Sequence, residues 1–179
     1  MQVSEKTVLR KNTTGEERPF TVCFVCTGNT CRSPMAEALV NDAMRPVEIC
    51  TACDPHRLAK KREVFAVSAG LMANGAPIAP HAVRALEKAG VICMAGNDYR
   101  SHLSRTIDEQ IMDACDLIVC MTGLHAMRLL SEFPSYASKI TCMPNDIPDP
   151  FGGDESVYDA CLAAIKQGID QMGLCEDGV

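Results

Sequence analysis

The stretch TVCFVCTGNTCRSPMAEAL, residues 21–39, places a short apolar run, a polar turn and a helix-forming segment in succession. Residues 21–26 are apolar and rich in valine, phenylalanine and cysteine, which is typical of a buried strand. Ser33 and Pro34 suit the start of a helix, because serine can cap the first turn and proline fits its backbone. The sequence therefore predicts a strand, a tight turn and a helix, with Cys26 and Arg32 at the two ends of the turn.

Three further apolar runs, at residues 64–70, 116–121 and 139–144, are predicted to be strands, and the segments around them have helical patterns. Strands that alternate with helices favour one parallel sheet covered by helices on both faces. We therefore expect an α/β fold of a single domain with four parallel strands. In such folds ligands bind at the carboxyl ends of the strands, where the turn after the first strand lies.

Composition narrows the possible partners. The chain has 179 residues, which suggests one domain, and its formal net charge of −6 argues against nucleic acid or an anionic membrane as the main partner. No apolar run approaches the roughly 18 residues that span a bilayer, and no secretory signal is expected. Residues 1–19 are polar and are predicted to be a flexible N-terminal extension, which leaves residues 20–179 as the domain. We expect a monomer.

Eleven cysteines are scattered through apolar stretches, which fits reduced thiols in the cytoplasm better than a disulfide framework. Two Cys-x-x-Cys pairs, Cys23 with Cys26 and Cys50 with Cys53, could bind zinc. The spacing between the pairs is longer than in common zinc ribbons, and Cys23 and Cys26 should point to opposite faces of a strand. We therefore expect no metal and no cofactor, with a zinc-binding interaction module as the remote alternative. Cys50 and Cys53 could also be a redox pair or a fortuitous one.

The turn between strand and helix has the chemistry of an anion site. Unpaired N–H groups and the helix dipole favour a bound anion there, and the same field stabilises a thiolate at Cys26. Gly28 and Asn29 tolerate unusual backbone conformations, so the turn can aim its N–H groups inward. Arg32 supplies a planar fork for phosphate oxygens, and Ser33 can donate a hydrogen bond to the thiolate. The turn is therefore predicted to hold a tetrahedral oxyanion above a nucleophile.

A cysteine nucleophile beneath a phosphate implies a phosphocysteine intermediate, whose formation needs a general acid. Asp146, Asp149 and Asp154 lie in or directly after a loop rich in proline and glycine that follows the last predicted strand. Asp149 is the best placed of the three, because this loop leaves the same edge of the sheet as the turn. His102 could be catalytic, but we interpret it as a residue that ties down a loop.

These residues together resemble the low-molecular-weight protein tyrosine phosphatases. The resemblance runs from about residue 20 to 170 and includes VCTGNTCRSPMAEAL at 25–39, SAGL at 68–71, PHAVRAL at 80–86, HLSR at 102–105, DLIVCMT at 116–122 and DPFGG at 149–153. It implies a phosphatase domain over residues 20–179, a four-stranded parallel sheet, no metal, phosphorylated proteins as substrates and a phosphocysteine mechanism. Cys26 matches the nucleophile, Arg32 the phosphate ligand and Asp149 the general acid. The residues expected to hold the loop, the phosphate or the substrate are Thr27, Gly28, Asn29, Thr30, Cys31, Ser33 and Phe151.

Thr30 and Phe151 bear on the substrate. Members that act on phosphotyrosine usually have an aliphatic residue in place of Thr30 and a tyrosine in place of Phe151, so this chain resembles the bacterial protein arginine phosphatase branch. A guanidinium is rich in donors and gains from the Thr30 hydroxyl and the Asp149 carboxylate as acceptors. We therefore predict hydrolysis of phosphoarginine in proteins. A tyrosine phosphatase and a thiol-dependent arsenate reductase, which needs further redox cysteines, are the alternatives.

Two further expectations follow from the resemblance. Cys31 matches a second loop cysteine that in the family can form a reversible disulfide with the nucleophile, so a Cys26–Cys31 disulfide is possible here; a packed cysteine at the helix start is the alternative. Residues 1–19 and 46–62 exceed the usual length of the family. The second of these segments could alter access to the site or carry an interaction.

Overall fold

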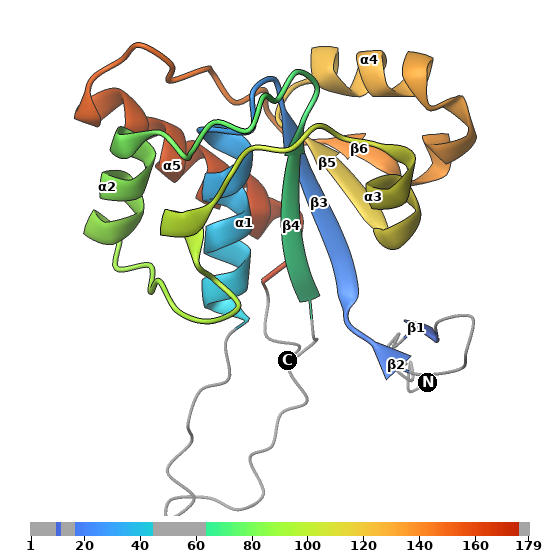
Figure 1. The fold of residues 1–179 in the computed structure, drawn as a ribbon, viewed down its shortest axis with the longest axis horizontal. Helices are drawn as coiled ribbons and strands as arrows, with labels where there is room; N and C mark the ends of the chain where they lie inside the picture. Colours follow the sequence, from blue (N-terminus) through green and yellow to red (C-terminus); the bar gives the residue numbers. More distant parts are fainter. Residues whose placement is uncertain (1–9, 12–16, 45–63, 176–179) are drawn as a thin grey trace, which may run out of the picture.

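The computed structural model describes residues 10–11, 17–44 and 64–175 (Figure 1). Most of the predicted extension lies outside these ranges, so its flexibility stays a prediction. The connection at residues 46–62, with Cys50 and Cys53, also lies outside the described residues. Among the described residues no helix is long and apolar enough to cross a membrane.

The central sheet has four strands in the order β4-β3-β5-β6, and all its neighbouring strands are parallel. This confirms the predicted fold class. Its register pairs Cys26 of β3 with Gly70 of β4, and Val25 of β3 with Cys120 of β5, so the carboxyl ends of three strands meet at one edge. The strand bounds are Phe20–Cys26 for β3, Val64–Gly70 for β4, Leu117–Cys120 for β5 and Ile140–Cys142 for β6.

Helices cover both faces of the sheet, as the alternating pattern predicts (Figure 1). Successive side chains of β3 point to opposite faces: Val22 and Phe24 join the core beneath α1, α2 and α5, whereas Cys23 and Val25 join the core beneath α3 and α4. Cys26 belongs to the first core and Cys23 to the second, so these two thiols do lie on opposite faces. The helices are α1 (Arg32–Ala43), α2 (Pro80–Lys88), α3 (Glu109–Ala114), α4 (Gly123–Glu132) and α5 (Glu155–Gln171), with short 3-10 turns η1 (Tyr99–Ser101) and η2 (Pro134–Lys139).

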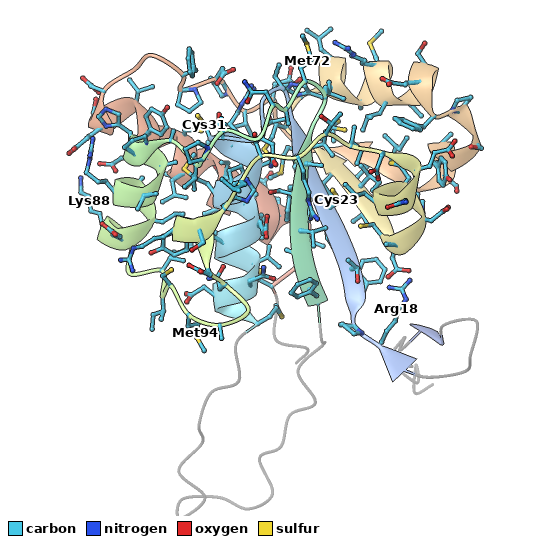
Figure 2. The ribbon with its side chains drawn as sticks, viewed as in Figure 1. Arg18, Cys23, Cys31, Met72, Lys88 and Met94 are labelled. Carbon is cyan, nitrogen blue, oxygen red and sulfur yellow. The ribbon has the colours of Figure 1, made fainter. Side chains whose placement is uncertain are left out.

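The last residues of the predicted extension are fixed to the domain. Strands β1 (Arg10–Lys11) and β2 (Glu17–Arg18) pair as a short antiparallel ribbon. The guanidinium of Arg18 donates to both carboxylate oxygens of Asp116, each at 2.7 Å, and the backbone N–H of Thr21 donates to the same carboxylate. Figure 2 shows Arg18 at the opposite end of the molecule from Cys31 and Met72. The ion pair therefore secures the start of β3, at the end of the strand opposite the turn that follows Cys26.

The start of α1 differs from the expectation. Cys31 occupies the N-cap position and its side chain makes no capping hydrogen bond. Ser33 lies inside the first turn, and its hydroxyl faces Cys26 at 3.0 Å instead of capping the helix. The prediction of a Ser33 cap is therefore wrong, because a tertiary partner competes for that hydroxyl.

Backbone hydrogen bonds join the loop after β3, residues 27–31, to the segment after β4. The N–H groups of Leu71 and Met72 donate to the carbonyls of Cys26 and Thr27, at 3.0 and 2.9 Å. Farther along the chain, the N–H of Ala79 donates to the carbonyl of Thr30 at 2.8 Å. The close approach requires a glycine at position 70, since a Cβ there would lie 2.8 Å from the Thr27 carbonyl oxygen.

We expect Gly70→Ala to lower the free energy of unfolding by about 1–3 kcal/mol, the usual range for overpacking. The added methyl group would meet backbone atoms, which cannot turn away as a flexible side chain can. Urea unfolding followed by circular dichroism measures the change. Gly123→Ala is the matched control, because the nearest atom to its added Cβ would be 3.9 Å away. Equal stability of the Gly70 variant and the wild type would contradict this interpretation.

Candidate active site

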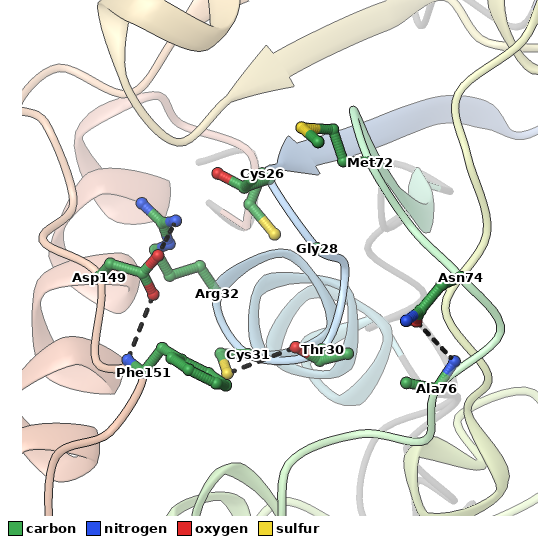
Figure 3. A pocket seen from close by; sticks show the side chains of 11 residues that line it. Cys26, Gly28, Thr30, Cys31, Arg32, Met72, Asn74, Ala76, Asp149 and Phe151 are labelled. Carbon is green, nitrogen blue, oxygen red and sulfur yellow. Dashed lines mark hydrogen bonds and ion pairs between the residues drawn. The ribbon is translucent and has the colours of Figure 1, made fainter.

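A cavity of about 370 Å³ opens at the carboxyl edge of the sheet (Figure 3). It brings together residues from the loop after β3, the segment after β4 and the loop after β6. Of the predicted site residues, Asn29 and Ser33 are absent from its wall because both are fully buried beneath it. The lining residues are Cys26, Thr27, Gly28, Thr30, Cys31, Arg32, Met72, Asn74, Ala76, Asp149 and Phe151.

The Cys26 thiol sits at the base of the cavity and is only 2% exposed. Its Sγ accepts a hydrogen bond from the backbone N–H of Asn29 at 3.3 Å and lies 3.0 Å from the Ser33 hydroxyl. The Asn29 carboxamide donates to that hydroxyl at 2.9 Å, so the single proton of Ser33 is shared between two acceptors, the sulfur at 3.0 Å and the backbone carbonyl of Ala69 at 3.3 Å. Donors directed at sulfur favour the thiolate, which is the nucleophilic form.

Asn29 determines the shape of the loop. It has a φ of 56° and is the one non-glycine residue with positive φ among those described. Its side-chain nitrogen donates to the hydroxyls of Ser33 and Ser68, and its oxygen accepts from the backbone N–H of Arg105. The carboxamide thus uses both of its donor protons and its acceptor. Gly28, by contrast, does not have positive φ, so the expectation that it supplies an unusual conformation is wrong.

A buried polar network supports Asn29 from behind. Ser68 donates to the carboxylate of Glu37 at 2.5 Å, and burial raises the pKa of that carboxyl group. His102 donates from Nε2 to the backbone carbonyl of Asn29 at 2.9 Å, which agrees with its interpretation as a loop-tying residue. Ser68 and Arg105 lie in the SAGL and HLSR motifs, so the sequence marked their segments but not their roles. Glu37 was missed, since a glutamate in a helical pattern usually faces solvent.

Arg32 is held between the cavity and the loop after β6. Its side chain is buried, Nη1 donates to the carbonyl of Ile147 at 3.2 Å, and Nη2 pairs with Asp149 at 2.6 Å. Its Nε is also buried and has no hydrogen-bond partner among the described residues. One donor of the guanidinium is therefore unused, and another is paired with a carboxylate whose side chain is 50% exposed.

The three candidate acids have different positions. Asp146 accepts a hydrogen bond from the N–H of Gly123 at the start of α4, and Asp154 caps α5 by accepting from the N–H of Val157. Asp149 alone of the three lines the cavity. Its second oxygen accepts from the N–H of Phe151 at 3.2 Å, which orients the carboxylate toward Arg32 (Figure 3). The two other aspartates fix the ends of the loop that carries it.

The buried Cys31 side chain contacts two hydroxyl groups. Its sulfur is 3.3 Å from the Tyr158 hydroxyl and 3.6 Å from Thr30 Oγ1. Burial raises the pKa of the Cys31 thiol more than the hydrogen bond from Tyr158 lowers it, so this cysteine is protonated at neutral pH. Cys26 and Cys31 are both free thiols in the structure, and their disulfide stays a prediction.

The far wall of the cavity was not predicted. It consists of Met72, Asn74 and Ala76 from the loop after β4, facing Thr30 and Phe151 across the opening (Figure 3). The sequence could have predicted this wall, because the loop follows a parallel strand and must therefore lie at the carboxyl edge of the sheet. In the described part of the chain, no three histidine, cysteine or acidic side chains gather in a way that could hold a metal ion.

Comparison with known proteins matches this architecture. Residues 21–174 match the family described as low molecular weight phosphotyrosine protein phosphatase. The protein-arginine-phosphatase of Bacillus subtilis is 33% identical over 159 residues, which cover 84% of this chain and 93% of that protein. The structure of YwlE arginine phosphatase from Geobacillus stearothermophilus superposes with a TM-score of 0.69 at 30% identity, covering 86% of this chain and 90% of that one.

A third similar protein is named as a tyrosine phosphatase and not as an arginine phosphatase. The low molecular weight protein tyrosine phosphatase of T. tengcongensis superposes with a TM-score of 0.68 at 32% identity, covering 86% of this chain and 97% of that one. The family match at residues 21–174 includes the loop after β3, and both superpositions cover 86% of this chain. The chain therefore belongs to the low molecular weight phosphotyrosine protein phosphatase family and is a cysteine-dependent phosphatase.

Proposed function

We propose that this chain is a protein arginine phosphatase that hydrolyses phosphoarginine through a phosphocysteine at Cys26. The observation that carries the substrate assignment is the Thr30 hydroxyl on the cavity wall, in a cavity that also presents Asp149 and Phe151. Two acceptors then face the donor-rich guanidinium, which an aliphatic residue at position 30 could not provide. The similarity to proteins named protein-arginine-phosphatase from two bacteria supports the same assignment.

In the first step the phosphoryl group enters the loop and the Cys26 thiolate attacks phosphorus. A sulfur–phosphorus bond forms and the phosphorus–nitrogen bond breaks. Asp149 takes up a proton from solvent when the phosphoryl group replaces it at Arg32, and it gives this proton to the leaving nitrogen. The arginine side chain therefore leaves as a neutral guanidine and not as an anion. In the second step a water attacks phosphorus, Asp149 takes its proton, and the electron pair of the sulfur–phosphorus bond returns to Cys26. Phosphate and free enzyme result.

Arg32 is the group we propose to bind the phosphoryl oxygens. Its unused Nε and its Nη2 form one edge of the guanidinium, which is the edge that suits bidentate binding. Phosphate binding at that edge would replace Asp149 on Nη2. The half-exposed carboxylate would then be free to turn toward the leaving group.

The first test compares kcat/KM for a phosphoarginine peptide and a phosphotyrosine peptide of the same flanking sequence, with reductant present. We expect a clear preference for phosphoarginine, and no turnover of either peptide by Cys26→Ser, because the hydroxyl is a far weaker nucleophile. A preference for phosphotyrosine would keep the mechanism and overturn the substrate assignment. Thioredoxin-coupled arsenate reduction in place of both activities would favour the reductase alternative.

The second test removes one hydroxyl without changing side-chain shape. Thr30→Val should lower kcat/KM for phosphoarginine by roughly 5- to 150-fold, the equivalent of leaving a buried donor unpaired at about 1–3 kcal/mol. Thr30→Ser keeps the hydroxyl and is the matched control. Activity on p-nitrophenyl phosphate should stay close to that of the wild type, because this substrate has no guanidinium donors. Equal losses on both substrates would show that Thr30 supports the loop and not the substrate.

The third test separates the two proposed roles of Asp149. Asp149→Asn should lower kcat by about 10²–10⁴-fold, the usual contribution of a general acid. The same change should strengthen competitive inhibition by inorganic phosphate, because the carboxylate no longer competes for Arg32. Inhibition constants from steady-state kinetics measure this effect. Weaker inhibition by phosphate would contradict the proposed exchange at Arg32.

A further inference from the structure

A buried histidine joins the phosphate loop to helix α4. His125 is 8% exposed and lies in the first turn of α4, where its Nε2 is 2.9 Å from the hydroxyl of Thr27. Its Nδ1 is 2.8 Å from the hydroxyl of Thr122, the residue that caps the same helix. Neither the fold nor the proposed chemistry requires a histidine here. Its two ring nitrogens nevertheless both have partners, and one partner lines the cavity.

The contact with the capping residue favours one tautomer of the His125 ring. Thr122 Oγ1 already accepts from the backbone N–H of His125 at 3.3 Å, which leaves the hydroxyl proton of Thr122 to be donated. Nδ1 is the acceptor that the structure places next to this hydroxyl. We therefore assign Nδ1 as unprotonated and place the proton of the neutral imidazole on Nε2, because this tautomer pairs the hydroxyl proton of Thr122 as well as both ring nitrogens. His125 then donates to Thr27, and the hydroxyl proton of Thr27 is free to point into the cavity.

The surroundings keep this imidazole neutral. Burial lowers the pKa of His125, and the nearby Arg32 guanidinium lowers it further. Asp149 and Asp146 raise it, but less than burial lowers it. A protonated ring would make Nδ1 a donor and would force the Thr122 hydroxyl away from it. Near neutral pH the chain Thr122–His125–Thr27 therefore has a single direction of donation.

We propose that the Thr27 hydroxyl contacts the phosphorylated side chain and that His125 is the positioning residue that orients it. This inference rests on the proposed phosphatase function and extends it to a residue outside the phosphate loop. The oriented hydroxyl offers one proton and one lone pair to the substrate on the exposed wall of the cavity. A substrate contact on the wall changes binding more than it changes the chemical step at Cys26.

The test is a double-mutant cycle between Thr27 and His125. Thr27→Val should raise KM for the phosphorylated peptide by roughly 2- to 12-fold, the equivalent of one hydrogen bond at about 0.5–1.5 kcal/mol, and should change kcat less. His125→Leu should have the same effect. The double variant should be no worse than either single variant, because both remove one interaction. His125→Gln should keep KM close to the wild-type value, since a glutamine side-chain nitrogen can reach the position of Nε2 and donate to Thr27.

Two controls make the outcome decisive. Met127→Leu, on an exposed position of α4, should leave kinetics and thermal stability as in the wild type. The cycle is measured on whichever phosphorylated substrate the wild-type enzyme hydrolyses, so an incorrect substrate assignment is detected in the wild type alone. Multiplicative effects of the two changes would overturn the inference. A His125→Leu variant with lower melting temperature but unchanged KM would also overturn it, by assigning this histidine a purely structural role.

Discussion

The hydrogen bonds of the Asn29 carboxamide hold the loop after β3 in a conformation that L-residues rarely adopt. A left-handed residue costs free energy unless its surroundings over-determine it. Here the side chain bonds Ser33, Ser68 and the backbone of Arg105, while the backbone N–H faces the Cys26 sulfur. The position of the nucleophile, the orientation of the Ser33 hydroxyl and the concave shape of the loop all depend on these bonds. The bonds to Ser33, Ser68 and the sulfur are buried, so losing one of them would leave a buried polar group unsatisfied.

The second organising feature is the sharing of Arg32 between a carboxylate and the anion it is proposed to bind. A buried guanidinium needs counter-charge, and Asp149 supplies it from a half-exposed loop. The same residue is the proposed acid, so charge balance at the arginine and proton supply at the leaving group are linked. Asp146 accepts from the first N–H of α4 and Asp154 caps α5, so the ends of the loop are anchored while its middle carries the reactive carboxylate.

The sequence allowed the fold and the centre of the site to be predicted because both rest on short-range patterns. Cys26 and Arg32 are six residues apart between a strand and a helix, and Asp149 follows the rule that parallel strands end at one edge. Two roles were predicted for Ser33, and only the helix cap is wrong, because a hydroxyl at a helix start has both local and tertiary partners. Its predicted partner, the Cys26 sulfur, lies 3.0 Å from the hydroxyl. Glu37 and His125 gave no local signal, since their partners are 31 and 98 residues away along the chain. Contacts between residues so far apart along the chain form only when the strands assemble into the sheet, so a local sequence pattern does not predict them.

The backbone bonds between the phosphate loop and the segment after β4 have a consequence for how the family can diversify. Carbonyls of Cys26, Thr27 and Thr30 are held by N–H groups, which every residue except proline possesses. The side chains at positions 72, 74 and 76 therefore form the far wall without contributing to those bonds. Evolution can exchange them, and thereby change which phosphorylated group is admitted, while the cradle keeps its geometry. At this far wall, unlike at Thr30 and Asp149, a side chain can change without altering either the hydrogen bonds of the loop or the proposed acid.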